Sequence, residues 1–298
     1  MTIILAGGSG FLGRKLRAQL ERDGHRVVNL TRAPRPDHPD DVAWQPDGTA
    51  GQLATHLNGA DAVVNLAGEN IAGGFWTEKR KAQLRASRLL TTRTIATAIA
   101  ACERPPAVLV NASAVGYYGP HGQEAVSERT AAGSDFLGRL CVDWEQEARA
   151  VSSPATRLAI VRSGLVLAAD GGALEKMLPP FRLGLGATLG SGEQYLAWIH
   201  IDDWVAMVIW LIHTNHAMGA FNASAPVPVT NRSFTRTLGR VLHRPAFFQA
   251  PGFIMKIALG EMADVLLTGQ RALPAAAEEL GFRFAYPELE PALRSLNL

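Results

Sequence analysis

The sequence contains very little cysteine, and this absence excludes two classes of site. Its 298 residues include only Cys102 and Cys141, which lie far apart and form neither a CxxC pair nor a Cys/His spacing. Two isolated cysteines provide neither a disulfide framework nor a zinc cluster, and they are typical of a reducing compartment. We therefore expect a cytoplasmic protein with no metal site.

Long hydrophobic runs are also missing. The longest apolar run, Trp204 to Ile212, has nine residues, whereas a membrane-spanning helix needs about 20. The chain enters a strand-like pattern at Thr2 and lacks the basic segment with which a signal peptide begins. We expect neither a membrane partner nor a secretory leader.

The chain has little net charge and no long run of charges of one sign. The net charge is +2, and there is no block of five or six like charges. Scattered basic residues make nucleic acid an unfavourable partner. We expect a small-molecule substrate instead, and the pattern favours no particular oligomeric state.

The first half of the chain alternates short apolar runs with longer helical patterns. The apolar runs are rich in Val, Ile, Leu or Ala without clean alternation, which is typical of strands buried on both faces. Strands are predicted near residues 2–6, 26–30, 62–66, 107–112 and 156–161, and helices over residues 12–22, 78–101 and 136–150. This order predicts an α/β fold, a Rossmann-type doubly wound parallel sheet with helices on both faces.

The rhythm changes after Leu167. Residues 168–194 are rich in glycine and proline and show no strand–helix alternation, and the chain is mostly helical after residue 229. We predict a Rossmann domain over residues 1–168, to which a segment near 200–224 returns. A smaller, mostly helical domain is predicted over residues 169–298.

A glycine cluster follows the first predicted strand, in the stretch AGGSGFLGRKL. Gly7 permits a tight turn, Gly10 lets a diphosphate approach the backbone, and Gly13 lets the following helix pack close to the sheet. The helix N-terminus, entered through Phe11 and Leu12, offers free N–H groups to phosphates. An ordinary strand–helix corner is the alternative, but a position at the very start of a βαβ unit favours a nucleotide site.

The residues at the end of the second predicted strand indicate which dinucleotide this site binds. An NAD site places an acidic residue about 20 residues beyond the glycines, but this strand ends in Thr31 and Arg32, and the next acid is Asp37. Arg32 can bind a 2′-phosphate through charge-assisted hydrogen bonds, and Thr31 can add a hydroxyl. The sequence therefore predicts NADP, with a solvated surface arginine as the alternative.

The third predicted strand ends in Leu66, Ala67 and Gly68. Small residues with free backbone groups at this edge of a doubly wound sheet lie where the adenosine and ribose of a dinucleotide bind. We expect these three residues to contact the cofactor.

These stretches, in this order, resemble the extended branch of the short-chain dehydrogenase/reductase superfamily, which includes nucleotide-sugar epimerases. Longer stretches such as NLAGENIAGGFWTEKRKAQLRASRLLTT, SAVGYYG and GQRALPAAAEELGFRFAYPELEPAL look like one atypical group, the epimerase family with a C-terminal helical domain of unassigned function. The resemblance covers essentially the whole chain. It implies an NADP(H)-binding Rossmann fold, with cofactor contacts from Thr31, Arg32, Leu66, Ala67, Arg88 and Arg162. For Arg88 and Arg162, a surface ion pair is the alternative.

The catalytic machinery departs from the pattern of that superfamily. Typical relatives carry Tyr-x-x-x-Lys on the helix after the fifth strand, where lysine lowers the tyrosine pKa and a serine holds the substrate hydroxyl. Here residues 135–148 contain neither tyrosine nor lysine, and no tyrosine has a lysine four positions later. Ser113, Tyr117 and Tyr118 remain as candidate catalytic residues, with a tyrosine as the acid. Alternatively, both tyrosines only line the pocket.

A polar cluster lies in the stretch WIHIDDWV. Asp202 or Asp203 is predicted to cap the helix that follows, and His200 is predicted to pack or hydrogen-bond near the floor of the pocket rather than to act in catalysis.

Two functional interpretations remain open. The first is an NADP-dependent oxidoreductase or epimerase acting on a sugar-like or carbonyl substrate, which the retained Ser113 and the paired tyrosines favour. The second is a non-catalytic NADP(H)-binding sensor or scaffold, which the absent Tyr/Lys pair favours.

Overall fold

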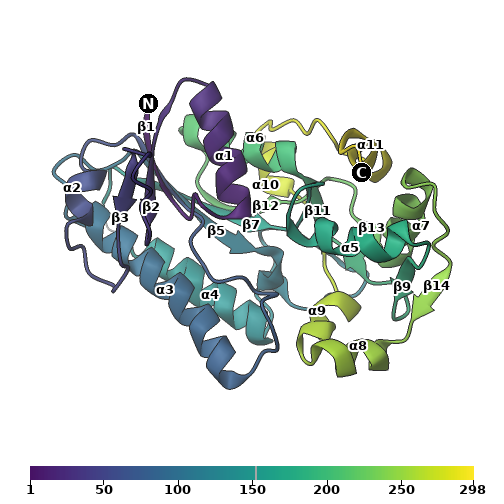
Figure 1. The fold of residues 1–298 in the computed structure, drawn as a ribbon. Helices are drawn as coiled ribbons and strands as arrows, with labels where there is room; N and C mark the ends of the chain where they lie inside the picture. Colours follow the sequence, from purple (N-terminus) through teal and green to yellow (C-terminus); the bar gives the residue numbers. More distant parts are fainter. Residues whose placement is uncertain (152) are drawn as a thin grey trace.

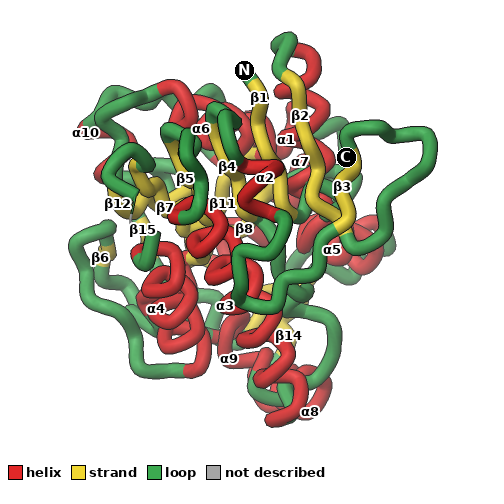
Figure 2. Tube along the Cα trace, turned by 90° about the vertical axis from the view of Figure 1, so that its left-hand side faces the viewer, coloured by secondary structure: helices red, strands yellow, loops and turns green. Residues whose placement is uncertain are grey.

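The computed structural model describes residues 1–151 and 153–298 and is built around a seven-stranded parallel sheet (Figure 2). Its strand order is β12-β7-β5-β4-β1-β2-β3, and every neighbouring pair is parallel. The strands are β1 (Thr2–Ala6), β2 (Arg26–Thr31), β3 (Asp41–Ala43), β4 (Ala62–Asn65), β5 (Val108–Ala114), β7 (Arg157–Ser163) and β12 (Gly219–Ala223). The predicted fold class and the returning strand β12 are confirmed.

Helices cover both faces of this sheet (Figure 1). One face carries α1 (Phe11–Arg22) and α6 (Ile201–His213), and the other carries α2 (Leu53–Leu57), α3 (Glu78–Ala100) and α4 (Phe136–Arg149). Alternate residues of β1 serve the two layers, because Ile3 and Leu5 belong to one apolar cluster and Ile4 and Ala6 to another.

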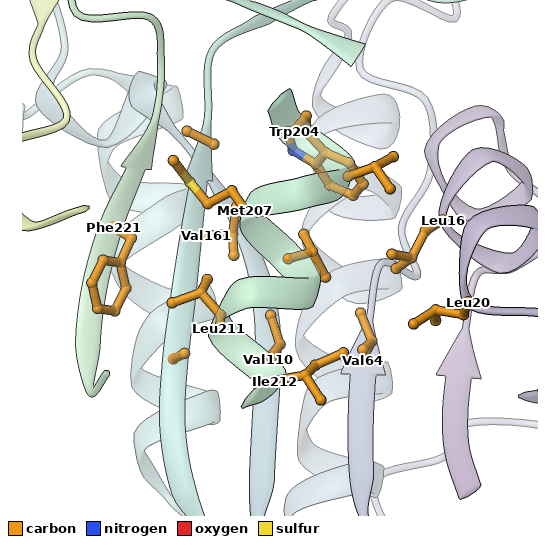
Figure 3. Close-up of a cluster of buried hydrophobic side chains, with 14 of the residues drawn as sticks. Leu16, Leu20, Val64, Val110, Val161, Trp204, Met207, Leu211, Ile212 and Phe221 are labelled. Carbon is orange, nitrogen blue, oxygen red and sulfur yellow. The ribbon is translucent and has the colours of Figure 1, made fainter. Parts of the chain in front are cut away.

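The layer beneath α1 and α6 forms the larger apolar cluster. Figure 3 shows Leu16 and Leu20 of α1 and Trp204 of α6 turned toward the sheet, where Val64 and Val110 meet them. All five side chains are fully buried. This packing holds α1, and therefore the glycine turn that precedes it, against the carboxyl end of β1.

The strand order reverses between β1 and β4. The chain proceeds outward from β1 to β2 and β3, and then crosses back to β4 and β5. Ligands of doubly wound sheets bind in the crevice outside the carboxyl ends of the strands at such a reversal. The fold thus positions a crevice beside Gly7 and Leu66.

The C-terminal part packs α5 (Gly172–Arg182), α7 (Asn231–Val241) and α11 (Leu289–Ser295) around a third apolar cluster that includes Trp198 and Phe234. Four two-stranded pairs connect its loops: β8 (Leu165–Leu167) with β11 (Trp198–His200), β9 (Ala187–Leu189) with β14 (Phe248–Ala250), β10 (Tyr195–Leu196) with β13 (Val229–Thr230), and β6 (Ala125–Val126) with β15 (Arg271–Ala272). The remaining elements are η1 (Val115–Tyr118), α8 (Gly252–Leu259), α9 (Met262–Leu267) and α10 (Ala275–Glu279). The domain boundary at residue 168 stays a prediction. Across residues 1–151 and 153–298, no helix combines the length and apolar character of a membrane span.

Helix α5 was not expected in the glycine- and proline-rich segment. Pro179 and Pro180 lie inside it, and neither has an N–H to give to the preceding turn. The helix forms because Leu174, Leu178 and Phe181 share one face and bury it in the third cluster. Burial of three large apolar side chains offsets the lost hydrogen bonds.

The start of α6 differs from its prediction. His200 caps this helix, since its Nδ1 accepts from the backbone N–H of Asp202 at 3.1 Å. Asp203 instead accepts from the backbone N–H groups of Ala285 and Tyr286, at 2.7 and 2.9 Å. The prediction that an aspartate caps α6 is wrong, because the Asp203 carboxylate fastens the C-terminal segment onto the helix.

His200 is buried at this junction. Its ring centroid lies 4.0 Å from that of Tyr286, and its Nε2 lies 3.2 Å from Ser295 Oγ. Burial lowers the pKa of His200, while the charges of Asp202 and Asp203 oppose that shift only in part. The histidine is therefore a neutral structural group that holds α6 to the C-terminal segment.

The buried His200 predicts a pH-dependent stability. Below about pH 6.5, the unfolded chain takes up a proton that the folded chain resists. The free energy of unfolding should therefore fall with decreasing pH, by at most about 1.4 kcal/mol per pH unit for this one group. Urea unfolding between pH 7.5 and pH 5.5 measures this slope.

The variant His200→Asn is the control. Asparagine also caps helices but does not titrate, so its slope should be shallower than that of the wild type. Carboxylates away from this junction titrate alike in both proteins. Equal slopes would show that His200 does not contribute.

Candidate cofactor site

The glycine turn has the geometry that its spacing predicts. Gly7 has φ +84°, and a Cβ there would lie 2.8 Å from the carbonyl carbon of Leu66. A Cβ on Gly13 would lie 2.2 Å from the Gly7 oxygen, and Gly10 donates its N–H to that oxygen at 3.0 Å. Larger residues at Gly7 or Gly13 would push α1 away from the sheet. The turn thus forms a shallow backbone cradle that side chains would fill.

A cavity of about 460 Å³ opens above this turn. It lies over the carboxyl ends of β1, β2 and β4, the place that the strand reversal specifies. Seven predicted cofactor residues line it: Gly7, Gly10, Thr31, Arg32, Leu66, Ala67 and Gly68. Ser9, Trp44 and Thr91 line it too and were not predicted as site residues. Trp44 directly follows β3, a strand of only three residues that was not among the predicted strands.

Phe11, Leu12 and Gly13 lie beneath the cavity rather than along it. The Phe11 ring packs against the segment that enters α5, since a Cβ on Gly171 would lie 2.2 Å from it. Leu12 packs against the main apolar cluster. The first N–H groups of α1 have no intrahelical partner, so any contact with a cofactor would come from the backbone here. That contact stays a prediction.

A second cavity, of about 370 Å³, adjoins the first and shares Ser9, Thr31 and Ala33 with it. It adds three arginines that were not predicted as site residues, Arg14, Arg17 and Arg35, of which Arg17 is paired with Glu21 and Asp41. Arg35 Nε lies 2.9 Å from the buried carboxylate of Asp41, and this hydrogen bond holds the pKa of Asp41 well below its usual range. The guanidinium of Arg32 makes no hydrogen bond or ion pair with any residue that the structure describes.

Arg88 is held beside the same cavity. Its Nη1 donates to the carbonyl of Leu84 at 3.1 Å and its Nη2 to that of Glu69 at 3.0 Å. A Cβ on Gly68 would lie 3.3 Å from the Arg88 side chain, and the guanidinium lies 5.1 Å from the Trp144 ring. Burial lowers the pKa of Arg88, yet an arginine stays charged at neutral pH. A positive charge therefore lies behind the wall of the cavity.

Arg162 is committed to a buried ion pair. Its Nε and Nη2 donate to the two carboxylate oxygens of Glu145 on α4, at 2.8 and 2.9 Å, and its Nη1 donates to the hydroxyl of Tyr118 at 2.9 Å. Arg162 is 2% exposed and Glu145 is fully buried. Direct contact of Arg162 with a cofactor stays a prediction, and each of its donor nitrogens is already engaged inside the protein. The sequence reasoning missed Glu145, although its position on the amphipathic α4 was a usable signal.

The three candidate catalytic residues gather around this ion pair. Ser113 Oγ donates to Glu145 at 2.8 Å, and the Tyr118 hydroxyl donates to Oδ1 of Asn222 at 2.7 Å. Burial raises the pKa of Tyr118 to about 12. Tyr117 lies with its ring centroid 3.4 Å from the Arg162 guanidinium carbon and is the only one of the three that is partly exposed. Whether any of them acts in catalysis stays a prediction.

Helix α4 presents a cysteine toward Ser113. The thiol of Cys141 contacts the carbonyl of Ala114 at 3.8 Å and is buried. Burial raises the pKa of Cys141 to about 11, so the group stays a protonated thiol at neutral pH. Glu145 is the α4 carboxylate that contacts Ser113, in the region where typical relatives carry tyrosine and lysine.

The comparison with known families agrees with this geometry. Residues 3–224 match the NAD dependent epimerase/dehydratase family, and residues 250–296 match a domain of unknown function, DUF1731. The chain therefore belongs to the NAD dependent epimerase/dehydratase family, and the atypical group that the sequence resembles, with its unassigned C-terminal domain, is confirmed.

Three individual proteins illustrate how similar this chain is to other members of the family. Epimerase family protein Mb2239 of Mycobacterium bovis is 41% identical over 293 residues, which covers 98% of this chain and 96% of that protein. The crystal structure of the human epimerase family protein SDR39U1 (isoform 2) with NADPH has a TM-score of 0.92 and 37% identity and covers 99% of both chains. A nucleoside-diphosphate sugar epimerase from Corynebacterium glutamicum has a TM-score of 0.80 and 33% identity, over 99% of this chain and 58% of that chain.

The Arg162–Glu145 pair predicts a large effect on stability. Arg162→Met leaves the Glu145 carboxylate buried with only the half-exposed Arg149 as a charged partner, and loss of one member of a buried pair costs about 3–5 kcal/mol. The double variant Arg162→Met, Glu145→Leu should unfold at a higher urea concentration than the single variant. A single variant within 1 kcal/mol of the wild type would contradict this.

Proposed function

We propose that this protein binds NADP(H) in the cavity above the glycine turn. The observation that carries the proposal is the guanidinium of Arg32, which has no partner among the described residues and follows β2, where an NAD site would have a carboxylate. The diphosphate would lie on the backbone of Gly7 and Gly10 at the N-terminus of α1. Thr31 and Arg32 would bind the 2′-phosphate. The NADPH-bound structure of a 37% identical relative supports the proposal.

The two cavities favour the phosphorylated cofactor further. Arg14 and Arg35 line the space adjoining Thr31, so three guanidinium groups can face one phosphoryl group. Asp41 ties Arg35 in place, which lowers the side-chain entropy that binding must overcome. An unphosphorylated ribose would leave Arg14 and Arg32 without an anionic partner, whereas Arg35 is already paired with Asp41.

We further propose that the protein is an oxidoreductase or an epimerase acting on a sugar-like or carbonyl substrate. NADP(H), when bound, supplies or accepts the hydride. Tyr117, the exposed member of the aromatic pair, would give or take the proton at the substrate oxygen. Ser113 would hold Glu145 through its hydrogen bond rather than hold the substrate. Membership of the family supports this assignment.

A second function is favoured by one specific observation. Ser113 and Tyr118 lie inside the buried network, and Cys141 faces Ser113 from α4. This is the arrangement expected of a cofactor-binding protein that performs no proton transfer. The alternative proposal is a non-catalytic NADP(H) sensor or scaffold.

The role of Arg32 can be tested by charge reversal. Arg32→Asp removes one or two charge-assisted hydrogen bonds, so the affinity for NADPH should fall about ten- to a hundredfold or more while NADH binding is retained. Calorimetric titration with both cofactors measures the preference. Arg283→Asp, an exposed arginine outside both cavities, is the matched control. An unchanged ratio of affinities would refute the assigned role.

Turnover separates the two functions. With NADPH and a panel of aldehydes, ketones and nucleotide sugars, the enzyme should oxidise the cofactor, and Tyr117→Phe should lower kcat by about 10²–10⁴-fold without changing NADPH affinity. Cofactor oxidation is followed by absorbance. An epimerase returns the hydride to its substrate and leaves no net oxidation, so the nucleotide sugars are also incubated with NADP⁺ and their epimers are separated by chromatography. Cofactor binding with neither oxidation of NADPH nor epimerisation of any substrate would favour the sensor or scaffold.

A further inference from the structure

A cavity beside α7 lies away from the cofactor site. It measures about 830 Å³ and is bounded by α7, the strand β14 and the C-terminal helix α11. In Figure 1, α7 and β14 lie at the opposite end of the molecule from β2 and β3. Its volume falls within the range of pockets that hold small molecules, about 300–1,000 Å³.

The lining of this cavity is strongly basic. Five arginines and a histidine contribute to it: Arg232, Arg236, Arg240, Arg244, Arg294 and His243. Two carboxylates partly compensate them, since Glu193 lies 3.0 Å from Arg232 and Glu290 lies 2.8 Å from Arg240 and 2.7 Å from Arg294. Arg236 has no hydrogen-bonding or ion-pair partner among residues 1–151 and 153–298. The cavity therefore carries an excess of positive charge.

The charge follows one face of α7. Arg232, Arg236 and Arg240 occur at intervals of four residues, opposite the buried face formed by Phe234 and Leu238. Like charges at this spacing destabilise a helix. The row therefore does not help α7 to fold, and an anion bound across it would relieve the repulsion.

An exposed aromatic pair completes the cavity. Phe247 and Phe248 are 75% and 43% exposed, and their ring centroids lie 4.6 Å apart. Close packing at Gly239 brings them beside α7, because a Cβ there would lie 2.7 Å from the Ala246 side chain. Exposed aromatic rings beside guanidinium groups are surfaces on which planar rings stack.

We propose that this cavity, which we call the α7 cavity, is a second ligand site that binds a phosphorylated small molecule with a planar ring, such as a nucleoside di- or triphosphate. The arginines of α7 bind the phosphates, and Phe247 stacks on the ring. The cavity is confined to the space between α7, β14 and α11, and the net charge of the whole chain is only +2. Both features favour a small ligand over a nucleic-acid strand.

Calorimetry tests the site. ATP is titrated into the full-length protein, both without cofactor and with NADPH at saturation, so that binding in the cofactor cavity is separated from binding in the α7 cavity. One ATP per chain should bind in the presence of NADPH. The Arg32→Asp variant should retain this event, which makes the result independent of the proposed cofactor role.

Two exposed substitutions locate the ligand. Arg236→Glu should weaken ATP binding at least tenfold, because it replaces the uncompensated cation by an anion. Phe247→Ala should weaken it about fivefold or more through loss of stacking. Arg283→Glu is the matched control for charge and should leave binding unchanged. Circular dichroism verifies that each variant is folded.

Other outcomes would overturn the proposal. If no ATP binds when NADPH is saturating, the α7 cavity is not a ligand site. If Arg236→Glu leaves the affinity for ATP unchanged, ATP binds elsewhere on the protein. If inorganic triphosphate binds as tightly as ATP and Phe247→Ala leaves the affinity for ATP unchanged, the site does not recognise a planar ring. Tighter binding of oligothymidine or of anionic vesicles than of ATP, abolished by Arg236→Glu, overturns the assigned class of ligand.

Discussion

The buried pair between Arg162 and Glu145 is the constraint on which the arrangement around β5 and β7 depends. A charge in a low-dielectric interior is costly unless it is paired and hydrogen-bonded, so every group that satisfies this pair must be present together. The chain of contacts runs from Glu145 through Arg162 to Tyr118 and Asn222, and the Asn222 backbone N–H donates to the Glu128 carboxylate at 2.8 Å. Glu128 also accepts from the backbone of Ala276 at 3.2 Å. A single polar network thus attaches the C-terminal segment to the edge of the sheet.

This network gives the two halves of the sheet edge different chemistry. Above β1 and β4, glycines leave an open backbone cradle and a cavity. Above β5 and β7, polar side chains satisfy one another and are closed to solvent. The edge above β1 and β4 is thus open for a ligand, while above β5 and β7 Ser113, Tyr118 and Arg162 satisfy one another inside the protein.

The C-terminal part adds surfaces of a different character. Asp203 and His200 fasten the last segment to α6, and α7 buries its apolar face while it exposes a row of arginines. Docking of this part therefore rests on apolar packing and buried hydrogen bonds, which leaves the charged face of α7 free to bind a ligand. The α7 cavity and the cofactor cavity are separate in space and in the residues that form them.

Local patterns in the sequence were sufficient to predict the parallel sheet, its glycine turn and the position of Arg32. Runs of apolar residues mark buried strands, glycine at position 7 permits the turn, and Arg32 directly follows the second strand, so each feature can be read from adjacent residues. Such patterns were insufficient for α5, whose prolines mask a helix that exists because Leu174, Leu178 and Phe181 are buried together. The roles of Ser113, Tyr118 and Arg162 were decided by tertiary structure alone, since their partner Glu145 comes from another element and its buried charge must be satisfied by whatever lies beside it. The same is true of the α7 cavity: the basic residues of 232–244 are neighbours in sequence, but the cavity they line exists only because β14 and α11 lie beside α7.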